Sequence, residues 1–177
     1  YVSGLNFCHA LLRKGGYRAI DRAFSRPPES TEEILHPQIY LRGKRDFTVP
    51  ADPQMPEELG LKEQKPVFRD TLGEFFVSTL LATWVSPQQA SEAASGWGGD
   101  RVVLYPREGE RKWALAWQLL WDSKDDASEF FDVLLKAYTV RFAKVKEQEK
   151  NAARFTDSDF GDIKLSLNGK EVLVLIY

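Results

Sequence analysis

The side chains that could bind a metal ion or act as nucleophiles are few, because the sequence contains one cysteine and two histidines. Cys8 and His9 are adjacent in a segment with helical periodicity, so their side chains point about 100° apart and form no catalytic dyad. A zinc site needs three or four ligands, and the sequence has no HExxH motif, no CxxC motif and no GxSxG nucleophile elbow. The sequence therefore predicts no cofactor or complete metal site in this chain, and a buried thiol at Cys8.

The second histidine, His36, closes the segment "RPPESTEEILHP". Ser30 and Glu33 have the spacing of a capping box, and Pro37 stops the short helix that they begin. A histidine in the last turn of a helix is favourable to the helix dipole when charged. The alternative is a catalytic role, in which His36 donates a hydrogen bond to a transition-state oxygen held by another domain.

A glycine-rich segment offers six residues for either a tight turn or a binding site: Gly96, Trp97, Gly98, Gly99, Asp100 and Arg101. The segment lacks the Lys-Ser/Thr of a P-loop and precedes a predicted strand, whereas a phosphate-binding loop precedes a helix. We therefore favour a structural role, in which the glycines turn the backbone sharply, the tryptophan is buried and the two charged residues fix the corner.

The elements that position these residues predict an α+β fold. Residues 1–36 form a helical arm, 37–69 an extended connector with short strands at 47–49 and 67–68, and 70–177 an accessory domain. In that domain helices pack on a small antiparallel sheet, in the order β-β-α-β-β.

Local signals mark the ends of the elements in residues 70–177. Thr71 and Glu74 have capping-box spacing, and Ser86 precedes a proline at a helix start. Ser123 caps a long helix that ends in the charged segment 144–150. Asn168 and Gly169 predict a type I′ hairpin turn.

Tryptophans alternate along the second predicted strand, "RKWALAWQLLWD", so Trp113, Trp117 and Trp121 share one face. We predict that they pack in the core against the helix that follows, and the alternative is an exposed platform for glycan. Ala114 and Ala116 face the other way, which indicates that both faces of the sheet are covered.

The composition excludes several partners. The 24 basic and 26 acidic residues give a net charge of −2, so no basic excess is present to bind nucleic acid. No apolar run approaches the 18 residues or so of a membrane span, and a single cysteine cannot form an intrachain disulfide. The chain opens without methionine inside a helical segment, so we expect further sequence upstream, including any targeting signal.

The order of four segments resembles the C-terminal part of a bacterial family: residues 1–37, then "DTLGEF", "SGWGGDRVVLY" and the tryptophan-bearing strand. These are peptidase MA-like, gluzincin-type zinc metallopeptidases, secreted or lipid-anchored, and the resemblance covers most of residues 1–138. It implies that the HExxH helix and a glutamate helix lie upstream, with any zinc, so no catalytic residue transfers to this chain. His36 and Tyr40 follow where gluzincins often place a transition-state donor, which makes them candidates by position.

We therefore expect a non-catalytic C-terminal portion of a secreted or cell-envelope metallopeptidase-like protein, which stabilises the catalytic half or positions a peptide substrate. Leu5, Leu11, Leu12 and Ile20 would dock on the missing peptidase-like region, or else be covered by the sheet domain or by a second copy in a homodimer. Two alternatives remain open: a stand-alone peptide- or glycan-binding module of the envelope, and an enzyme with an unrecognised carboxylate site.

Overall fold

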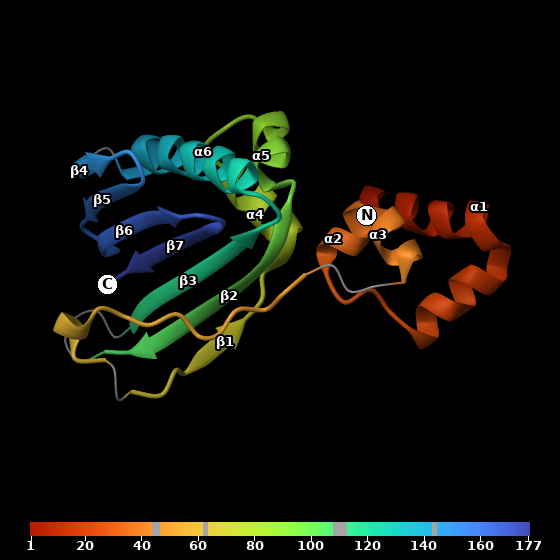
Figure 1. Ribbon diagram of the computed structural model, residues 1–177, viewed down its shortest axis with the longest axis horizontal. Coiled ribbons are helices and arrows are strands. Elements are labelled where there is room, and N and C mark those ends of the chain that lie inside the picture. Colours follow the sequence, from red (N-terminus) through yellow and green to blue (C-terminus); the bar gives the residue numbers. More distant parts are fainter. Residues whose placement is uncertain (44–46, 62–63, 108–112, 143–144) are drawn as a thin grey trace.

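The computed structural model describes residues 1–43, 47–61, 64–107, 113–142 and 145–177. The helices are α1 (Val2–Ser25), α2 (Thr31–Leu35), α3 (Pro37–Arg42), α4 (Gly73–Leu81), α5 (Pro87–Ala94) and α6 (Lys124–Phe142), with a 3₁₀ turn η1 at Glu57–Leu59. The strands are β1 (Phe68–Asp70), β2 (Trp97–Pro106), β3 (Trp113–Trp121), β4 (Val145–Glu149), β5 (Ala152–Asp157), β6 (Gly161–Asn168) and β7 (Glu171–Ile176). A helical arm, α1 to α3, projects from one side of a helix-covered sheet (Figure 1).

The sheet has seven antiparallel strands in the order β1-β2-β3-β7-β6-β5-β4. The fold is mixed α and β, but the predicted small β-β-α-β-β sheet is wrong. The segment 144–150 was predicted as a helix end, yet residues 145–149 form β4, which pairs with β5. All five residues of β4 are exposed, so no alternation of apolar and polar residues marked it as a strand.

Helices α4, α5 and α6 cover one face of the sheet (Figure 1) and enclose its main core. Trp97, Trp117 and Trp121 are buried there, and Trp121 stacks on Phe130 of α6 with ring centroids 4.4 Å apart. The predicted packing role is confirmed for Trp117 and Trp121, whereas Trp113 is 38% exposed. Because these indoles are enclosed, they cannot form the glycan platform considered above.

The connector covers part of the opposite face of the sheet. Met55 and Leu61 pack there against residues of β2, β3 and β7, including Val103 and Ala116, so both faces are covered as predicted. Residues 47–49 are not a strand, although Thr48 donates a backbone hydrogen bond of 2.8 Å to the Gly98 carbonyl.

The arm has its own small core. The helix α1 bends at Gly15 and Gly16, whose backbone angles are not helical. Phe7 and Leu11 pack with Tyr40, a residue of α3, so the arm continues through α3 instead of ending at residue 36.

The hairpin between β6 and β7 is present, but its turn is shifted by one residue. Asn168 pairs with Glu171, so the two residues of the turn are Gly169 and Lys170. Gly169 has φ of 62°, the left-handed conformation that such turns require at their first position.

Candidate functional site

The segment Gly96–Arg101 forms a corner that is organised around one buried carboxylate. Asp100 is fully buried, and its carboxylate accepts four hydrogen bonds of 2.9 to 3.1 Å. The donors are the backbone N–H groups of Leu72 and Gly73 and the indole N–H groups of Trp97 and Trp117. Asp100 therefore joins β2, β3 and the start of α4, and none of its oxygens is left for a ligand.

The predicted capping box at Thr71 is wrong. Helix α4 starts at Gly73 after Leu72, which makes no side-chain cap. The carboxylate of Asp100 takes the place of the local cap, because it accepts from two of the first amides of this helix. Glu74 therefore takes no part in a capping box, and its carboxylate contacts His36 of the arm instead.

Two glycines of the corner occupy positions where a residue with a side chain would be strained or would clash with its neighbours. Gly96 has φ of 82° and Gly99 has φ of 143°, both outside the range that most residues adopt. A Cβ atom on Gly99 would lie 1.8 Å from the Thr48 carbonyl oxygen, so only glycine allows the connector to pass here. Gly98, in contrast, does not have a positive φ.

Arg101 extends the corner to the connector. Its Nε lies 3.8 Å from Asp52 Oδ1. Arg69 also hydrogen bonds to the Asp52 carboxylate, at 2.5 Å. The structure thus places the whole set Gly96–Arg101 at a structural corner, where Gly96 lines one cleft and Trp97 lines another.

Helices α2 and α4 meet at the junction between the arm and the sheet domain. The Phe75 N–H donates to Thr31 Oγ1 at 3.2 Å, and a Cβ atom on Gly73 would lie 2.4 Å from the same oxygen. His36 Nε2 and Glu74 Oε1 share a hydrogen bond of 2.9 Å across this junction. His36 therefore contacts a residue 38 positions away, in addition to ending α2.

Glu74 is an unusual carboxylate, since 95% of its side chain is buried while 43% of the His36 side chain is exposed. Among the described residues, Glu74 Oε2 has no hydrogen-bond partner. Burial raises the pKa of the Glu74 carboxyl above its ordinary value of 4.5; the hydrogen bond and charge of His36 oppose this shift, and the nearby Asp122 carboxylate adds to it.

A cleft of about 480 Å³ lies beside this pair, and we call it the junction cleft. It is lined by residues of α2 and α3 on one side and of the sheet domain on the other: Glu32, His36, Gln38, Ile39, Arg42, Ser95, Gly96, Asp122 and Asp126. Three carboxylates and one guanidinium give it a surplus of negative charge when His36 is neutral. The arrangement is suited to a small cationic group.

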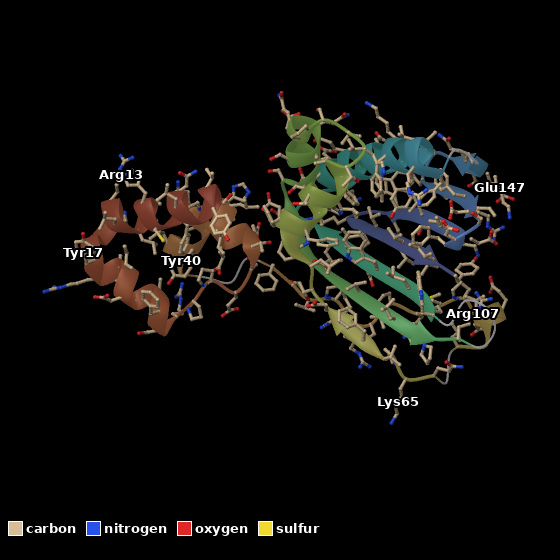
Figure 2. The ribbon with its side chains drawn as sticks, turned by 180° about the vertical axis from the view of Figure 1, so that it is seen from behind. Arg13, Tyr17, Tyr40, Lys65, Arg107 and Glu147 are labelled. Carbon is tan, nitrogen blue, oxygen red and sulfur yellow. The ribbon has the colours of Figure 1, made fainter. Side chains whose placement is uncertain are left out.

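Tyr40 lies apart from the junction cleft. It is buried in the arm, where Figure 2 shows it among the helices, and its hydroxyl donates to the Arg26 carbonyl at 2.6 Å. His36 and Tyr40, the two candidates by position, therefore line different clefts.

In the described residues, no three His, Cys, Asp or Glu side chains are grouped in a way that could hold a metal ion. Cys8 is exposed, so its predicted burial is wrong.

Sequence reasoning missed most of the junction cleft. Glu32 and Asp126 lie in the first turns of α2 and α6, and the Asp126 N–H donates to Ser123 Oγ at 3.1 Å. Asp122 was not noticed. The one available signal was a surplus of acidic residues at two helix starts, which local capping explains equally well.

The sequence comparisons concern mainly the sheet domain. The profile of a family described as "Domain of unknown function (DUF8575)" matches residues 62–176, more than half of the chain and none of the arm. No curated protein matches the sequence. The extracellular domain of PknH from Mycobacterium tuberculosis is a similar solved structure, with 11% sequence identity and a TM-score of 0.44 over 70% of this chain and 80% of that chain. At this TM-score the likeness supports no conclusion about function.

No helix in the described ranges has the length and hydropathy needed to cross a bilayer.

Proposed function

Because this chain belongs to DUF8575, a family of domains of unknown function, its role is inferred from its own geometry, and we propose that it is a non-catalytic, peptide-binding part of a larger protein. In this proposal the junction cleft takes a basic side chain, lysine or arginine, of a bound peptide. The remainder of the sheet domain is the rigid frame that holds the acidic wall of the cleft in place.

The observation that carries the proposal is the charge and shape of the junction cleft. Its volume of about 480 Å³ lies in the usual range of small-ligand pockets. Asp122 is exposed, and its carboxylate is close enough to raise the pKa of Glu74. A bound ammonium or guanidinium group would relieve the repulsion between these carboxylates, which favours a cation over a neutral ligand.

The junction itself makes the cleft sensitive to the arm. One wall comes from α2 and α3, and the other comes from the α5–β2 corner and the turn before α6. A peptide held there would contact both parts of the molecule, so binding would also stabilise the contact between the arm and the sheet domain.

The experiment is an amide NMR titration of the chain with N-acetyl-lysine methylamide, using the norleucine analogue as a neutral ligand of similar length. The lysine ligand should shift the amide signals of Ser95 and Gly96, while the norleucine ligand should leave them in place. Asp122→Asn should weaken binding about two- to fivefold, the usual size of one partly exposed charge pair.

The matched control is Asp125→Asn, because Asp125 is an exposed carboxylate in the first turn of α6 that does not line the junction cleft. This variant should bind like the wild type. An equal response to lysine and norleucine, or equal effects of the two asparagine variants, would contradict the proposal. Robust peptide hydrolysis by the purified chain would contradict its non-catalytic part.

We also propose that the larger protein is a secreted or envelope metallopeptidase-like protein, whose catalytic half this chain stabilises. This part of the proposal depends on the sequence resemblance of residues 1–138 alone. It is tested by reading the complete open reading frame for a signal peptide and an HExxH motif upstream of Tyr1. A complete frame without HExxH would refute it and would leave the peptide-binding proposal standing.

A further inference from the structure

The outer side of the arm exposes large apolar side chains. Leu5 and Leu12 in the first half of α1 are 70% and 37% exposed, and Tyr17 and Phe24 in the second half are 77% and 85% exposed. Each pair is seven residues apart, or about two helical turns, so its members lie on the same side of the helix. Leu11, in contrast, is buried in the arm core. Of the apolar residues expected to dock on another part, Leu11 is therefore covered by the arm itself, whereas Leu5 and Leu12 stay exposed.

Basic residues accompany these apolar side chains. Residues 1–26 contain five basic side chains and one acidic side chain, a net charge of +4 in a chain whose net charge is −2. Arg13, Lys14, Arg18 and Arg22 are all exposed. Figure 2 shows Arg13 and Tyr17 at the end of the arm that lies farthest from the sheet.

We propose that α1 binds the surface of an anionic lipid membrane, with Leu5, Leu12, Tyr17 and Phe24 entering the interface. A helix with exposed aromatic and aliphatic side chains beside arginine and lysine is typical of peripheral binding in the plane of the interface. The long basic side chains can keep their charged ends among the lipid headgroups while their stems stay near the acyl boundary. The proposed binding is at the membrane surface, and none of the helices in the described ranges is long and apolar enough to cross a bilayer.

The charge favours a lipid surface over a second copy of the chain. Two copies that met through α1 would bring together two helices of net charge +3 each, since Arg26 lies beyond the helix end, and this repulsion would oppose the apolar contact. The exposed residues also lie on two helical segments that diverge at Gly15 and Gly16, at the protruding end of the arm (Figure 1). A broad surface can meet both segments, whereas a single groove fits one straight helix.

A cleft on the arm supplies a place for a headgroup phosphate. It has a volume of about 300 Å³ and is lined by Arg22 and Arg26 together with Leu11, Tyr40 and Gly43, among others. Arg26 is held by a hydrogen bond of 3.2 Å to the Tyr40 carbonyl, so its position is fixed before a ligand arrives. Guanidinium groups form strong paired hydrogen bonds with phosphate.

The test is vesicle sedimentation of the complete 177-residue chain with phosphatidylcholine vesicles, with and without phosphatidylglycerol. The chain should pellet with the anionic vesicles, stay in solution with the neutral ones, and be released by added salt. Arg18→Glu should lower the partition coefficient about tenfold, because it reverses a charge near the lipid surface. Phe24→Ser should lower it by a similar factor, because it removes an inserted aromatic ring.

Matched controls change the sheet domain in the same way. Lys124→Glu reverses one exposed basic charge at the start of α6, and Phe75→Ser removes a ring that is 54% exposed on α4. Both controls should bind like the wild type. All four substituted side chains are exposed, and circular dichroism should show unchanged folding.

Several outcomes would overturn the inference. They are equal binding to neutral and anionic vesicles, or an Arg18 variant that binds like the Lys124 control. Complete competition by polyglutamate would point instead to an acidic protein, and complete competition by inorganic phosphate at constant ionic strength to a free-phosphate site. A dimer in sedimentation velocity that Phe24→Ser abolishes would point to a second copy.

Discussion

Replacing Gly99 by alanine should be among the most damaging small substitutions in this protein. The residue has φ of 143°, and an added Cβ would lie 1.8 Å from the Thr48 carbonyl oxygen and 2.8 Å from the carbonyl carbon. The obstacle is backbone of the connector, which cannot rotate aside as a flexible side chain would. Relief therefore requires the connector to move away from β2.

The cost can be estimated from the contacts that such a movement breaks. Backbone strain at Gly99 contributes about 1–2 kcal/mol, and loss of the hydrogen bond from Thr48 to Gly98 about 1 kcal/mol. Phe47, which stacks on Trp97 with centroids 5.6 Å apart, would lose roughly 0.5–1.5 kcal/mol of aromatic contact. Together these terms predict a loss of about 2.5–4.5 kcal/mol, or a melting temperature lower by roughly 5–18 °C.

The assay is urea denaturation followed by tryptophan fluorescence and circular dichroism, with Gly98→Ala as the control. A Cβ on Gly98 would meet Asp122 Oδ1 at 3.1 Å, which is the end of an exposed side chain that can move. The control should cost less than about 1 kcal/mol. If both variants unfold at the same urea concentration, the close approach of the connector to Gly99 is wrong.

Two further predictions concern buried carboxylates. Asp100→Asn should destabilise the chain by about 3–5 kcal/mol, because an amide nitrogen would face N–H donors that now bond to a carboxylate oxygen. Urea denaturation measures this loss of stability. A loss below about 1 kcal/mol would contradict the role of Asp100. For Glu74 the raised pKa means that wild-type stability is greatest where the carboxyl is protonated and is lost as the pH rises through that pKa. Glu74→Gln removes this dependence, so its stability relative to the wild type should rise as the pH increases above the ordinary carboxyl pKa of about 4.5 in a series of urea titrations. A constant difference would show that the pKa of Glu74 is not raised, and a falling difference would show that the buried charge is stabilised, with His36 as its partner.

The sequence by itself determined the elements that local signals encode. Ser86 accepts a hydrogen bond from the Gln89 N–H at 3.2 Å, as expected for a cap before a proline. The alternation in residues 113–121 predicted a strand buried on both faces, because a period of two sends successive side chains to opposite sides. The glycine-rich segment was identified as a corner, although the strained positions are Gly96 and Gly99 and not Gly98.

Only the tertiary structure decided which distant groups meet. Strand β4 is made by backbone pairing with β5, which its exposed, charged side chains do not reveal. The start of α4 is capped by Asp100 from β2, although Thr71 has the spacing of a local cap. His36 and Glu74 are brought together by the packing of α2 on α4, and the junction cleft is lined by residues from both the arm and the sheet domain. Local sequence specifies backbone preferences within a few residues, whereas hydrogen bonds between distant segments depend on how the whole chain buries its apolar surface.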